Sequence, residues 1–398
     1  MPLSTRPRTR APARRLAPTL RLATSEPRSL RIGIVTEYYY PHLGGICEHV
    51  HYFAREARRL GHHVDIITSR IKGSHDEPNV FRIGRSQPVY FNGSQARMTL
   101  GVGLGRQMRE TLSRGDYDVV HVHSPLSPSL PLLAIEAARC PLVGTFHTYF
   151  DGSRIYALGR SWLQKRMDRL DAVIGVSASA RDAIAHYFDA EWRIIPNGID
   201  LDAFNPGANR PRGLSADSPV ILFLGRFDPR NGLITLIEAF RKVRESGRDA
   251  HLVVVGDGPL RSHYYRAAAG HPDISFVGAV LHERPGYYAN AAVYACPTTK
   301  ASFGITLLES MACETPVVCS DIPGFRDVVK HEREALMFPC GDADALASDL
   351  SRLLDDPALR TRLGKAGRES AERYGWSAVT AKILEVYAEV LERSRVAV

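Results

Sequence analysis

The chain has 398 residues and is 44% hydrophobic, which is enough for two or three domains with cores of their own. Its formal net charge is +8, but residues 1–30 hold seven arginines and one acidic residue, so the other 368 residues carry only +2. A nearly neutral body argues against a nucleic-acid-binding protein, and the sequence lacks the run of about 18 apolar residues that predicts a membrane-spanning helix.

Residues 1–30 are rich in Arg, Pro, Ala, Ser and Thr without apolar periodicity, and we expect them to form a disordered basic tail. A solvated extension is the favoured interpretation, with an organelle transit peptide or a segment that touches anionic lipid as alternatives. The six cysteines are scattered, with neither a C-x-x-C motif nor a Cys/His cluster. We therefore expect a reducing, cytoplasmic location and no metal framework.

Strand-like runs alternate with helical patterns through the first half of the chain. The predicted strands cover 29–36, 64–68, 118–123, 142–147 and 172–176, and the predicted helices cover 46–60 and 130–138. Val/Ile-rich strands that alternate with helices predict a parallel sheet that is covered on both faces.

The alternation stops at residues 204–219, where Pro, Gly, Asn and Ser predict a linker, and it then restarts. In the second half we expect strands over 220–225, 252–256, 274–278, 293–296 and 316–319, and helices over 233–245, from Gly304 and over 377–392. The sequence therefore predicts a first domain over 31–210, a second over 211–375 and a helix over 376–398 that packs back on the first domain. Two doubly wound domains of this kind form a cleft at the carboxyl ends of their strands.

Two turns that follow predicted strands have features of an anion site. The first, residues 41–45 (PHLGG), combines paired glycines with a helix N-terminus, although a simple tight turn is the alternative. The second, residues 225–232 (GRFDPRNG), places Arg226 at a strand end, where a guanidinium can grip a diphosphate. A surface arginine beside a turn is the alternative there.

His147 lies within residues 145–148 (TFHT), at the end of another predicted parallel strand. Polar residues at this end of a strand point towards the cleft, so we favour a functional histidine over a structural one. His121 and His123 end a neighbouring strand, and one of them is expected to face the cleft.

The segment 299–312 (TKASFGITLLESMA) opens a predicted helix at Gly304 and carries Glu309. Backbone N–H groups at a helix N-terminus bind anions. Because Glu309 lies among Leu307, Leu308 and Met311, the helix should be largely buried, and a buried carboxylate needs a partner. Sugar hydroxyls can provide one; a solvated helix residue is the alternative.

Together these segments resemble the family 4 glycosyltransferases, from about Arg31 to the C-terminal helix. The resemblance implies the GT-B fold, an α/β architecture of two Rossmann-like, doubly wound domains that face each other across a cleft. It also implies transfer of a hexose from a nucleotide-sugar donor to an acceptor, with retention of the anomeric configuration. No Asp-x-Asp motif follows a predicted strand, so we expect no metal and no cofactor.

The resemblance also assigns roles by position. Gly45 would approach the donor diphosphate through its backbone, and Arg226 would neutralise the leaving group. His147 would contact the transferred sugar near the reacting centre, and Glu309 would hold the ribose. His147 and Arg226 are thus the catalytic candidates. The other donor-binding residues expected are Arg230, Asn231, Phe303, Gly304 and Ile305.

One subfamily is closer than the rest. Residues 90–97 (YFNGSQAR), 121–129 (HVHSPLSPS) and 145–148 resemble the phosphatidylinositol mannosyltransferases. This resemblance implies mannose transfer from GDP-mannose to a lipid or glycan acceptor, with phosphatidylinositol favoured, and a peripheral contact with the inner face of the membrane. The acceptor-binding residues expected are Asn92, Ser94, Arg97 and Thr148.

Three positions depart from the family pattern. Ala301 replaces the first glutamate of a pair whose second member is Glu309. Asn231 replaces a lysine beside the diphosphate, whose charge Arg230 can supply, and Cys47 replaces a polar residue near the acceptor. These departures leave a second hypothesis, a non-catalytic homologue that binds nucleotide sugar or serves as a partner subunit. A nicotinamide dehydrogenase is disfavoured because the full G-x-G-x-x-G fingerprint is missing.

Overall fold

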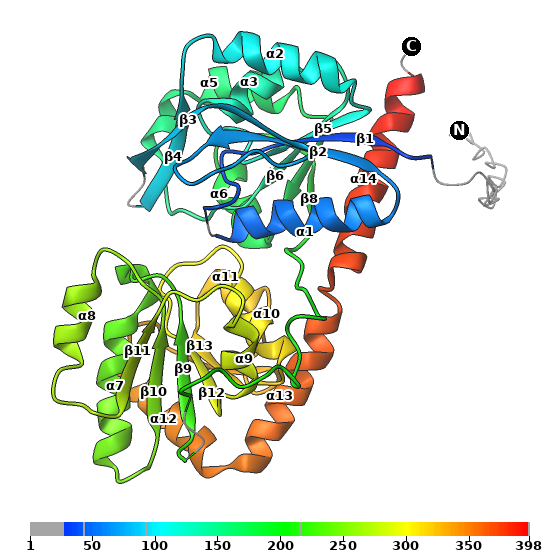
Figure 1. Cartoon of the computed structure of the whole chain (residues 1–398). Helices are drawn as coiled ribbons and strands as arrows, with labels where there is room; N and C mark the ends of the chain where they lie inside the picture. Colours follow the sequence, from blue (N-terminus) through cyan, green and yellow to red (C-terminus); the bar gives the residue numbers. More distant parts are fainter. Residues whose placement is uncertain (1–27, 43, 92–93, 215–216, 397–398) are drawn as a thin grey trace, which may run out of the picture.

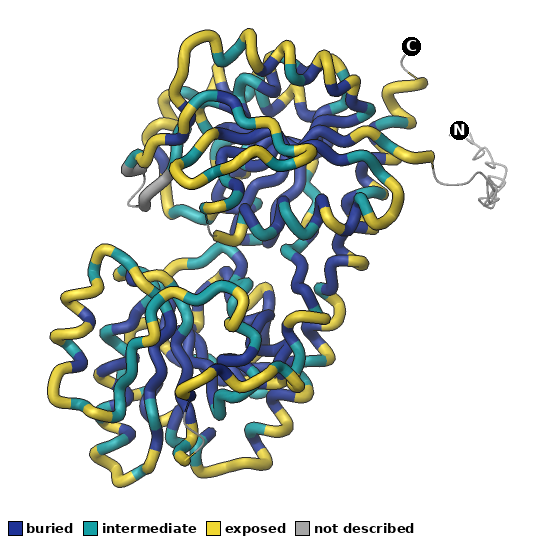
Figure 2. The backbone as a smooth tube through the Cα atoms, viewed as in Figure 1, coloured by how far each residue is buried: buried dark blue, intermediate teal, exposed yellow. Residues whose placement is uncertain are grey.

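The computed structural model describes residues 28–42, 44–91, 94–214 and 217–396. Two α/β domains lie one above the other, and the C-terminal helix runs from the second domain back along the first (Figure 1). In both domains the central strands are buried and the outer faces of the helices are exposed (Figure 2). This is the predicted architecture of two doubly wound domains.

The first domain is built on one sheet, in which β3 and β4 pair antiparallel and the other neighbours are parallel. In spatial order its strands are β4 (Ser94–Leu100), β3 (Val80–Phe91), β2 (His63–Arg70), β1 (Arg31–Val35), β5 (Val119–His123), β6 (Leu142–Phe146), β7 (Ala172–Gly175) and β8 (Trp192–Ile194). Its helices are α1 (Gly45–Arg59), α2 (Leu104–Gly115), α3 (Leu130–Ala137), α4 (Arg154–Leu158), α5 (Arg160–Met167) and α6 (Ala178–Ala185).

The second domain has an all-parallel sheet. In spatial order its strands are β11 (Ile274–Gly278), β10 (His251–Val255), β9 (Val220–Leu224), β12 (Val293–Cys296), β13 (Val317–Ser320) and β14 (Ala335–Phe338). Its helical elements are η1 (Pro229–Asn231), α7 (Leu233–Glu245), α8 (Arg261–Ala267), α9 (Arg284–Ala289), α10 (Ile305–Ala312), α11 (Pro323–Arg326), α12 (Ala343–Asp355) and α13 (Pro357–Glu372).

Strand order reverses between β1 and β5 in the first sheet, and between β9 and β12 in the second. At such a switch point the connections leave to opposite faces of the sheet, and a crevice opens at the carboxyl ends of the strands. The segments that follow β1, β9 and β12 are therefore the ones expected to line a ligand site.

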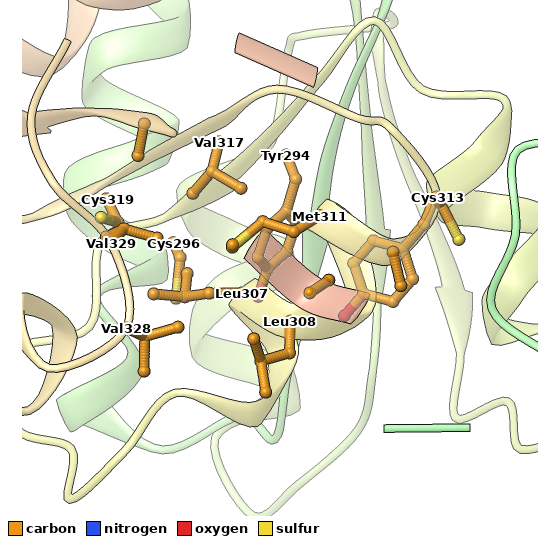
Figure 3. Packing of buried hydrophobic residues seen from close by; sticks show 14 of the residues in the cluster. Tyr294, Cys296, Leu307, Leu308, Met311, Cys313, Val317, Cys319, Val328 and Val329 are labelled. Carbon is orange, nitrogen blue, oxygen red and sulfur yellow. The ribbon is translucent and has the colours of Figure 1, made fainter. Parts of the chain in front are cut away.

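Helix α10 is fixed by apolar packing on the second sheet. Leu307, Leu308 and Met311 share a core cluster with Tyr294 of β12 and Val317 of β13 (Figure 3). Because several faces of α10 are buried in this way, its axis and its N-terminus are held rigidly relative to the sheet.

Helix α14 (Trp376–Val396) joins the core of the first domain. Its buried residues Ile383 and Tyr387 belong to the same apolar cluster as Ile32 of β1 and Phe53 of α1. The Tyr387 hydroxyl also lies 2.7 Å from Nδ1 of His121 on β5, which ties residues 266 positions apart. The end of the chain thus completes the first domain.

The predicted basic tail covers residues 1–30, and residues 1–27 of it lie outside the described part of the chain. The last three residues of that segment contact the first domain. Arg28 pairs with Asp118 at 3.1 Å, and the Ser29 hydroxyl donates to the carbonyl of Gly61 at 2.7 Å. Residues 28–30, which belong to the predicted tail, therefore lie against the first domain.

The β3–β4 hairpin is absent from the sequence prediction, as are the short strands β8 and β14. The hairpin lies at the edge of the sheet, where the buried residues among those described are Ile83, Ser86 and Thr99, so it lacks the continuous Val/Ile pattern of a buried strand. Pro88, in the middle of β3, also argues against a strand in a sequence prediction, although an edge strand tolerates it.

Candidate functional site

A cavity of about 450 Å³ lies between the two domains, at both switch points. The first domain contributes residues that follow β1, and the second contributes residues that follow β9 and β12. The lining includes Tyr38, His42, Gly44, Gly45, Arg226, Arg230, Asn231, Thr298, Ile305 and Thr306. The structure thus gathers five of the predicted donor-site residues, from three separate segments, around one cavity.

A second cavity of about 340 Å³ shares Gly45, Arg226 and Ile305 with the first. It extends over the ends of β10 and β11, where it is lined by Gly256 and Val280. Together the two cavities form one elongated space with a polar centre at Arg226.

The N-termini of α1 and α10, one from each domain, meet at the shared part of this space. Gly45 is the first residue of α1 and Ile305 is the first residue of α10, and both line the two cavities. Gly304 caps α10 with φ +97°, a conformation that favours glycine, and a Cβ there would lie 2.8 Å from the Phe325 ring. Two helix N-termini and an arginine make this centre electropositive.

Arg226 is the arginine at the centre, and its side chain is 49% exposed. Its Nη2 lies 3.8 Å from Asp228, whereas Nη2 of Arg230 lies 3.2 Å from the same carboxylate. Burial alone would raise the pKa of Asp228, but the hydrogen bonds from Arg230 hold it below its ordinary value. Asn231 donates from Nδ2 to the Arg226 carbonyl at 2.7 Å, so it orients this loop rather than supplying charge.

Gly232 joins this loop to α7 in a conformation that only glycine adopts easily. Its φ is +69°, and a Cβ there would lie 2.0 Å from the carbonyl oxygen of Pro297, which follows β12. We expect Gly232→Ala to lower the free energy of unfolding by about 3 kcal/mol in a urea titration, through strain and collision together. Gly270→Ala is the matched control, because Gly270 has φ +82° but open space around its Cβ position. Equal losses for both variants would contradict the close approach.

His147 lies in a buried cluster with His49, His121 and His123. Its side chain is 7% exposed, and its Nε2 lies 2.8 Å from Nδ1 of His123. The ring of His49 on α1 is 5.0 Å from that of His147, and His49 also lines the narrow space beside Glu309. Burial lowers the pKa of His49 to about 4 and holds that of His147 well below its ordinary value. The cluster is therefore uncharged at neutral pH.

Glu309 is 1% exposed, and protein groups supply its partners. Arg284 Nη1 donates to Oε1 at 2.8 Å, and the Tyr288 hydroxyl donates to Oε2 at 2.8 Å. The other end of the guanidinium, Nη2, reaches Oε1 of Glu48 in the first turn of α1 at 2.6 Å. The sequence predicted the need for a partner but not Arg284 or Tyr288, because these lie 25 and 21 positions before Glu309, too far for a local signal.

Three predicted site residues, Phe303, Gly304 and His147, are absent from the lining of these cavities. Phe303 is buried in the core of the second domain, where its ring is 6.0 Å from that of Tyr374. Ala301 is half-buried and packs against the same core, and its carbonyl is so close to Gly324 that a Cβ there would lie 2.1 Å away. Cys47 is buried on α1 and lines the first cavity, and burial raises the pKa of its thiol.

The predicted acceptor residues are distributed over the first domain. Asn92 lies outside the described residues, and Ser94 begins β4 opposite Phe91. The Arg97 guanidinium donates from Nε to the Ser86 hydroxyl at 2.7 Å. Thr148 is exposed after β6.

An apolar pocket of about 290 Å³ lies beside Arg97. Tyr38 lines both this pocket and the first cavity, and its hydroxyl accepts a hydrogen bond from the Arg97 backbone N–H at 3.3 Å. The other lining residues include Val89, Met98, Leu126, Leu132, Ile155, Tyr156, Trp162 and Leu163. Tyr38 therefore lies between the cavity at the two switch points and an apolar pocket on the first domain.

Within the described ranges, no group of three or more His, Cys, Asp or Glu side chains is arranged to hold a metal ion. In the same part of the chain, none of the helices combines the length and the hydropathy that crossing a membrane requires.

Comparisons with known families match both domains. Residues 43–203 match the model described as Glycosyltransferase Family 4, and residues 218–356 match Glycosyl transferases group 1. The chain is 34% identical to the phosphatidyl-myo-inositol mannosyltransferase of Mycobacterium tuberculosis, over 91% of this chain and 97% of that protein. It is 31% identical to the D-inositol 3-phosphate glycosyltransferase of Thermobispora bispora, over 70% and 72% of the two chains.

Solved structures with the same architecture are less similar in sequence. A sucrose-phosphate synthase from Thermosynechococcus elongatus superposes with a TM-score of 0.74 at 22% identity, over 91% of this chain and 99% of that one. Anabaena HepE in complex with UDP and glucose superposes with a TM-score of 0.72 at 17% identity, over 90% and 99%. The predicted resemblance and the predicted GT-B fold are therefore confirmed, and the chain belongs to the family 4 glycosyltransferases.

Proposed function

We propose that this glycosyltransferase moves a hexose, mannose in the favoured case, from a nucleotide-sugar donor to a lipid or glycan acceptor with retention. The observation that carries the proposal is the convergence of Arg226 with the N-termini of α1 and α10 on one cavity between the domains. A diphosphate is the group that such a centre binds best, because it has two negative phosphates to place against backbone N–H groups and a guanidinium.

In this proposal the donor lies along the elongated space. Its diphosphate lies against Gly45, Ile305 and Arg226, with Arg230 close by, and its nucleoside extends over the ends of β10 and β11. Glu309 offers its remaining lone pairs to the ribose hydroxyls. No metal is required, because Arg226 and the two helix N-termini supply the positive charge at the phosphates.

The proposed reaction exchanges one bond at the anomeric carbon. The acceptor oxygen bonds to that carbon as the bond to the donor phosphate breaks, on the same face of the sugar. The departing phosphate takes the proton of the acceptor hydroxyl. Negative charge therefore builds on the phosphate, and its stabilisation by Arg226 is the largest contribution that these residues can make.

His147 is proposed to contact the transferred sugar from the histidine cluster. Because burial keeps the pKa of His147 well below its ordinary value, the ring is neutral and acts through hydrogen bonding rather than charge. Its 2.8 Å contact with His123 limits how far the ring can turn.

Two observations support an inositol lipid as the acceptor. The similarity to the phosphatidyl-myo-inositol mannosyltransferase of Mycobacterium tuberculosis extends over 91% of this chain at 34% identity. The apolar pocket beside Arg97 suits a molecule with a polar head and an acyl chain. Arg97, Asn92, Ser94 and Thr148 remain the proposed head-group contacts. We further propose that the enzyme works in the cytoplasm, at the inner face of the membrane.

A donor screen tests this proposal. Purified protein is incubated with GDP-mannose, UDP-glucose or UDP-N-acetylglucosamine, with and without a lipid extract, and release of the nucleoside diphosphate is measured. We expect turnover with GDP-mannose. The relatives matched across the chain carry enzyme names, so the non-catalytic alternative gains no support from them. Nucleotide binding without turnover of any donor would revive it.

Ala301→Glu tests whether the loss of one glutamate weakens the sugar half of the site. A charge-assisted contact to a sugar hydroxyl contributes roughly 1.5–3 kcal/mol, so we expect KM for GDP-mannose to fall by about ten-fold or more. Ala301→Gln, which restores length without charge, should give a smaller gain. Unchanged or increased KM in both variants would mean that this position does not face the donor sugar.

A further inference from the structure

We propose that Arg284 is a positioning residue for nucleotide binding, which holds Glu309 as an oriented, ionised acceptor and couples it to the first domain through Glu48. The inference rests on the proposed function, in which Glu309 binds the ribose. Arg284 lies outside all of the motifs discussed above, at the start of the short helix α9.

The first observation is the position of the Arg284 guanidinium between two carboxylates. Arg284 donates to Glu309 at 2.8 Å and to Glu48 at 2.6 Å, so one guanidinium bridges a carboxylate from each domain. The bridge is mostly buried, because the exposed fractions of the Arg284, Glu48 and Glu309 side chains are 15%, 13% and 1%. A buried bridge of this kind holds its members in fixed directions, because each carboxylate loses its partner if the guanidinium turns.

The bridge borders the donor space. Arg284 and Glu48 both line the cavity that runs from Arg226 to the ends of β10 and β11. Glu309 lines the narrow space beside Gly45 and Ile305. An ionised carboxylate has about four lone-pair positions. Arg284 and Tyr288 use two of them, so Glu309 keeps acceptor capacity for two hydroxyls.

The charges around Glu309 also support the role of Arg284 in keeping this carboxylate ionised. The pKa of Glu309 is raised to about 7 by the net effect of four influences: burial raises it most, Arg284 lowers it, Glu48 raises it by repulsion, and the hydrogen bond from Tyr288 lowers it. The other titratable groups that interact with Glu309 are Tyr294 and Cys313, and burial raises the pKa of both, so they are neutral at pH 7. Without Arg284 the pKa of Glu309 rises further, and the protonated acid loses acceptor positions.

These contacts predict how the pH dependence of nucleotide affinity differs between variants of Arg284 and Glu48. If ribose binds ionised Glu309, affinity rises as pH rises through its pKa. Loss of Arg284 moves that rise to higher pH, whereas loss of the Glu48 charge moves it to lower pH. The ionisation of the nucleotide's own phosphates is common to all variants, so differences between variants report on the protein.

The experiment is calorimetric titration of the full chain with GDP and with UDP between pH 6 and pH 9. The variants are Arg284→Met, Arg284→Lys and Glu48→Gln. Asp151→Asn is the matched control, since it removes an ion pair to Lys300 that also joins the domains but is exposed. Melting temperatures are recorded for every variant.

At pH 7 we expect Arg284→Met to bind the better nucleotide at least about ten-fold more weakly than wild type, with most of the loss recovered at pH 9. Arg284→Lys keeps the charge but loses the fork that reaches both carboxylates, so we expect a loss and a pH shift between those of wild type and Arg284→Met. Glu48→Gln should shift the rise towards lower pH, and Asp151→Asn should change nothing.

A loss of equal size at every pH, or wild-type affinity in Arg284→Met, would overturn the inference. If Arg284→Met does not fold, Glu48→Gln is the deciding variant. A pH profile of nucleotide affinity in Glu48→Gln that matches wild type would overturn the inference. Wild-type protein that binds neither nucleotide would instead overturn the proposed function, and this inference with it.

Discussion

Replacing Arg226 with methionine is expected to slow sugar transfer by about 10²–10³-fold, measured as initial rates at saturating donor. Arg226 is the arginine at the point where the N-termini of α1 and α10 meet, and in the proposed reaction it faces the charge that develops on the leaving phosphate. Arg230 cannot replace it fully, because the Asp228 carboxylate already holds the Arg230 guanidinium at 3.2 Å.

Two further variants make this prediction specific. Arg226→Lys keeps the charge but loses the forked geometry, and we expect a loss of about ten-fold. Arg266→Met removes an exposed arginine on α8, outside the cavity, and should leave the rate unchanged. An Arg226→Met enzyme within about three-fold of wild type would exclude the proposed role.

Replacing Tyr387 with alanine is expected to lower the free energy of unfolding by about 3–5 kcal/mol in a urea titration. Tyr387 is fully buried where α14 packs into the first domain, so truncation leaves a cavity in a core that cannot close. The change also removes the hydrogen-bond partner that lies 2.7 Å from Nδ1 of His121.

Tyr387→Phe separates the two contributions. It keeps the ring and removes only the hydroxyl, so we expect about 1–3 kcal/mol, the cost of one buried polar group left without its partner. If both variants cost less than about 1 kcal/mol, α14 would not be an integral part of the first domain.

The sequence predicted best those elements whose pattern arises from burial on both faces. The limits of α7 and β12 agree with the prediction to the residue. All four residues of β12 are buried and Pro297 follows them, and glycines at 232 and 247 flank the apolar pattern of α7. Helix α10 begins directly after Gly304, as predicted. The edge hairpin of β3 and β4 was missed, since exposed strands lack that pattern.

The residues of the candidate site also fall into two groups, those that the sequence predicted and those that it did not. Gly45, Arg226 and Ile305 could be found because each follows a recognisable strand, and the carboxyl ends of parallel strands meet at one edge. Arg284 and Glu48 could not be found, since the contact between them depends on how the two domains face each other. The same applies to Tyr38, whose place between two cavities follows from the missed hairpin.

The most direct test of the account is transfer of labelled mannose from GDP-mannose to phosphatidylinositol by the purified protein, followed by NMR of the product. We expect a mannosylated inositol lipid with the anomeric configuration of the donor, and its near-complete loss in Arg226→Met. An inverted product, or no transfer of any sugar by a protein that binds nucleotide and is folded, would contradict the account.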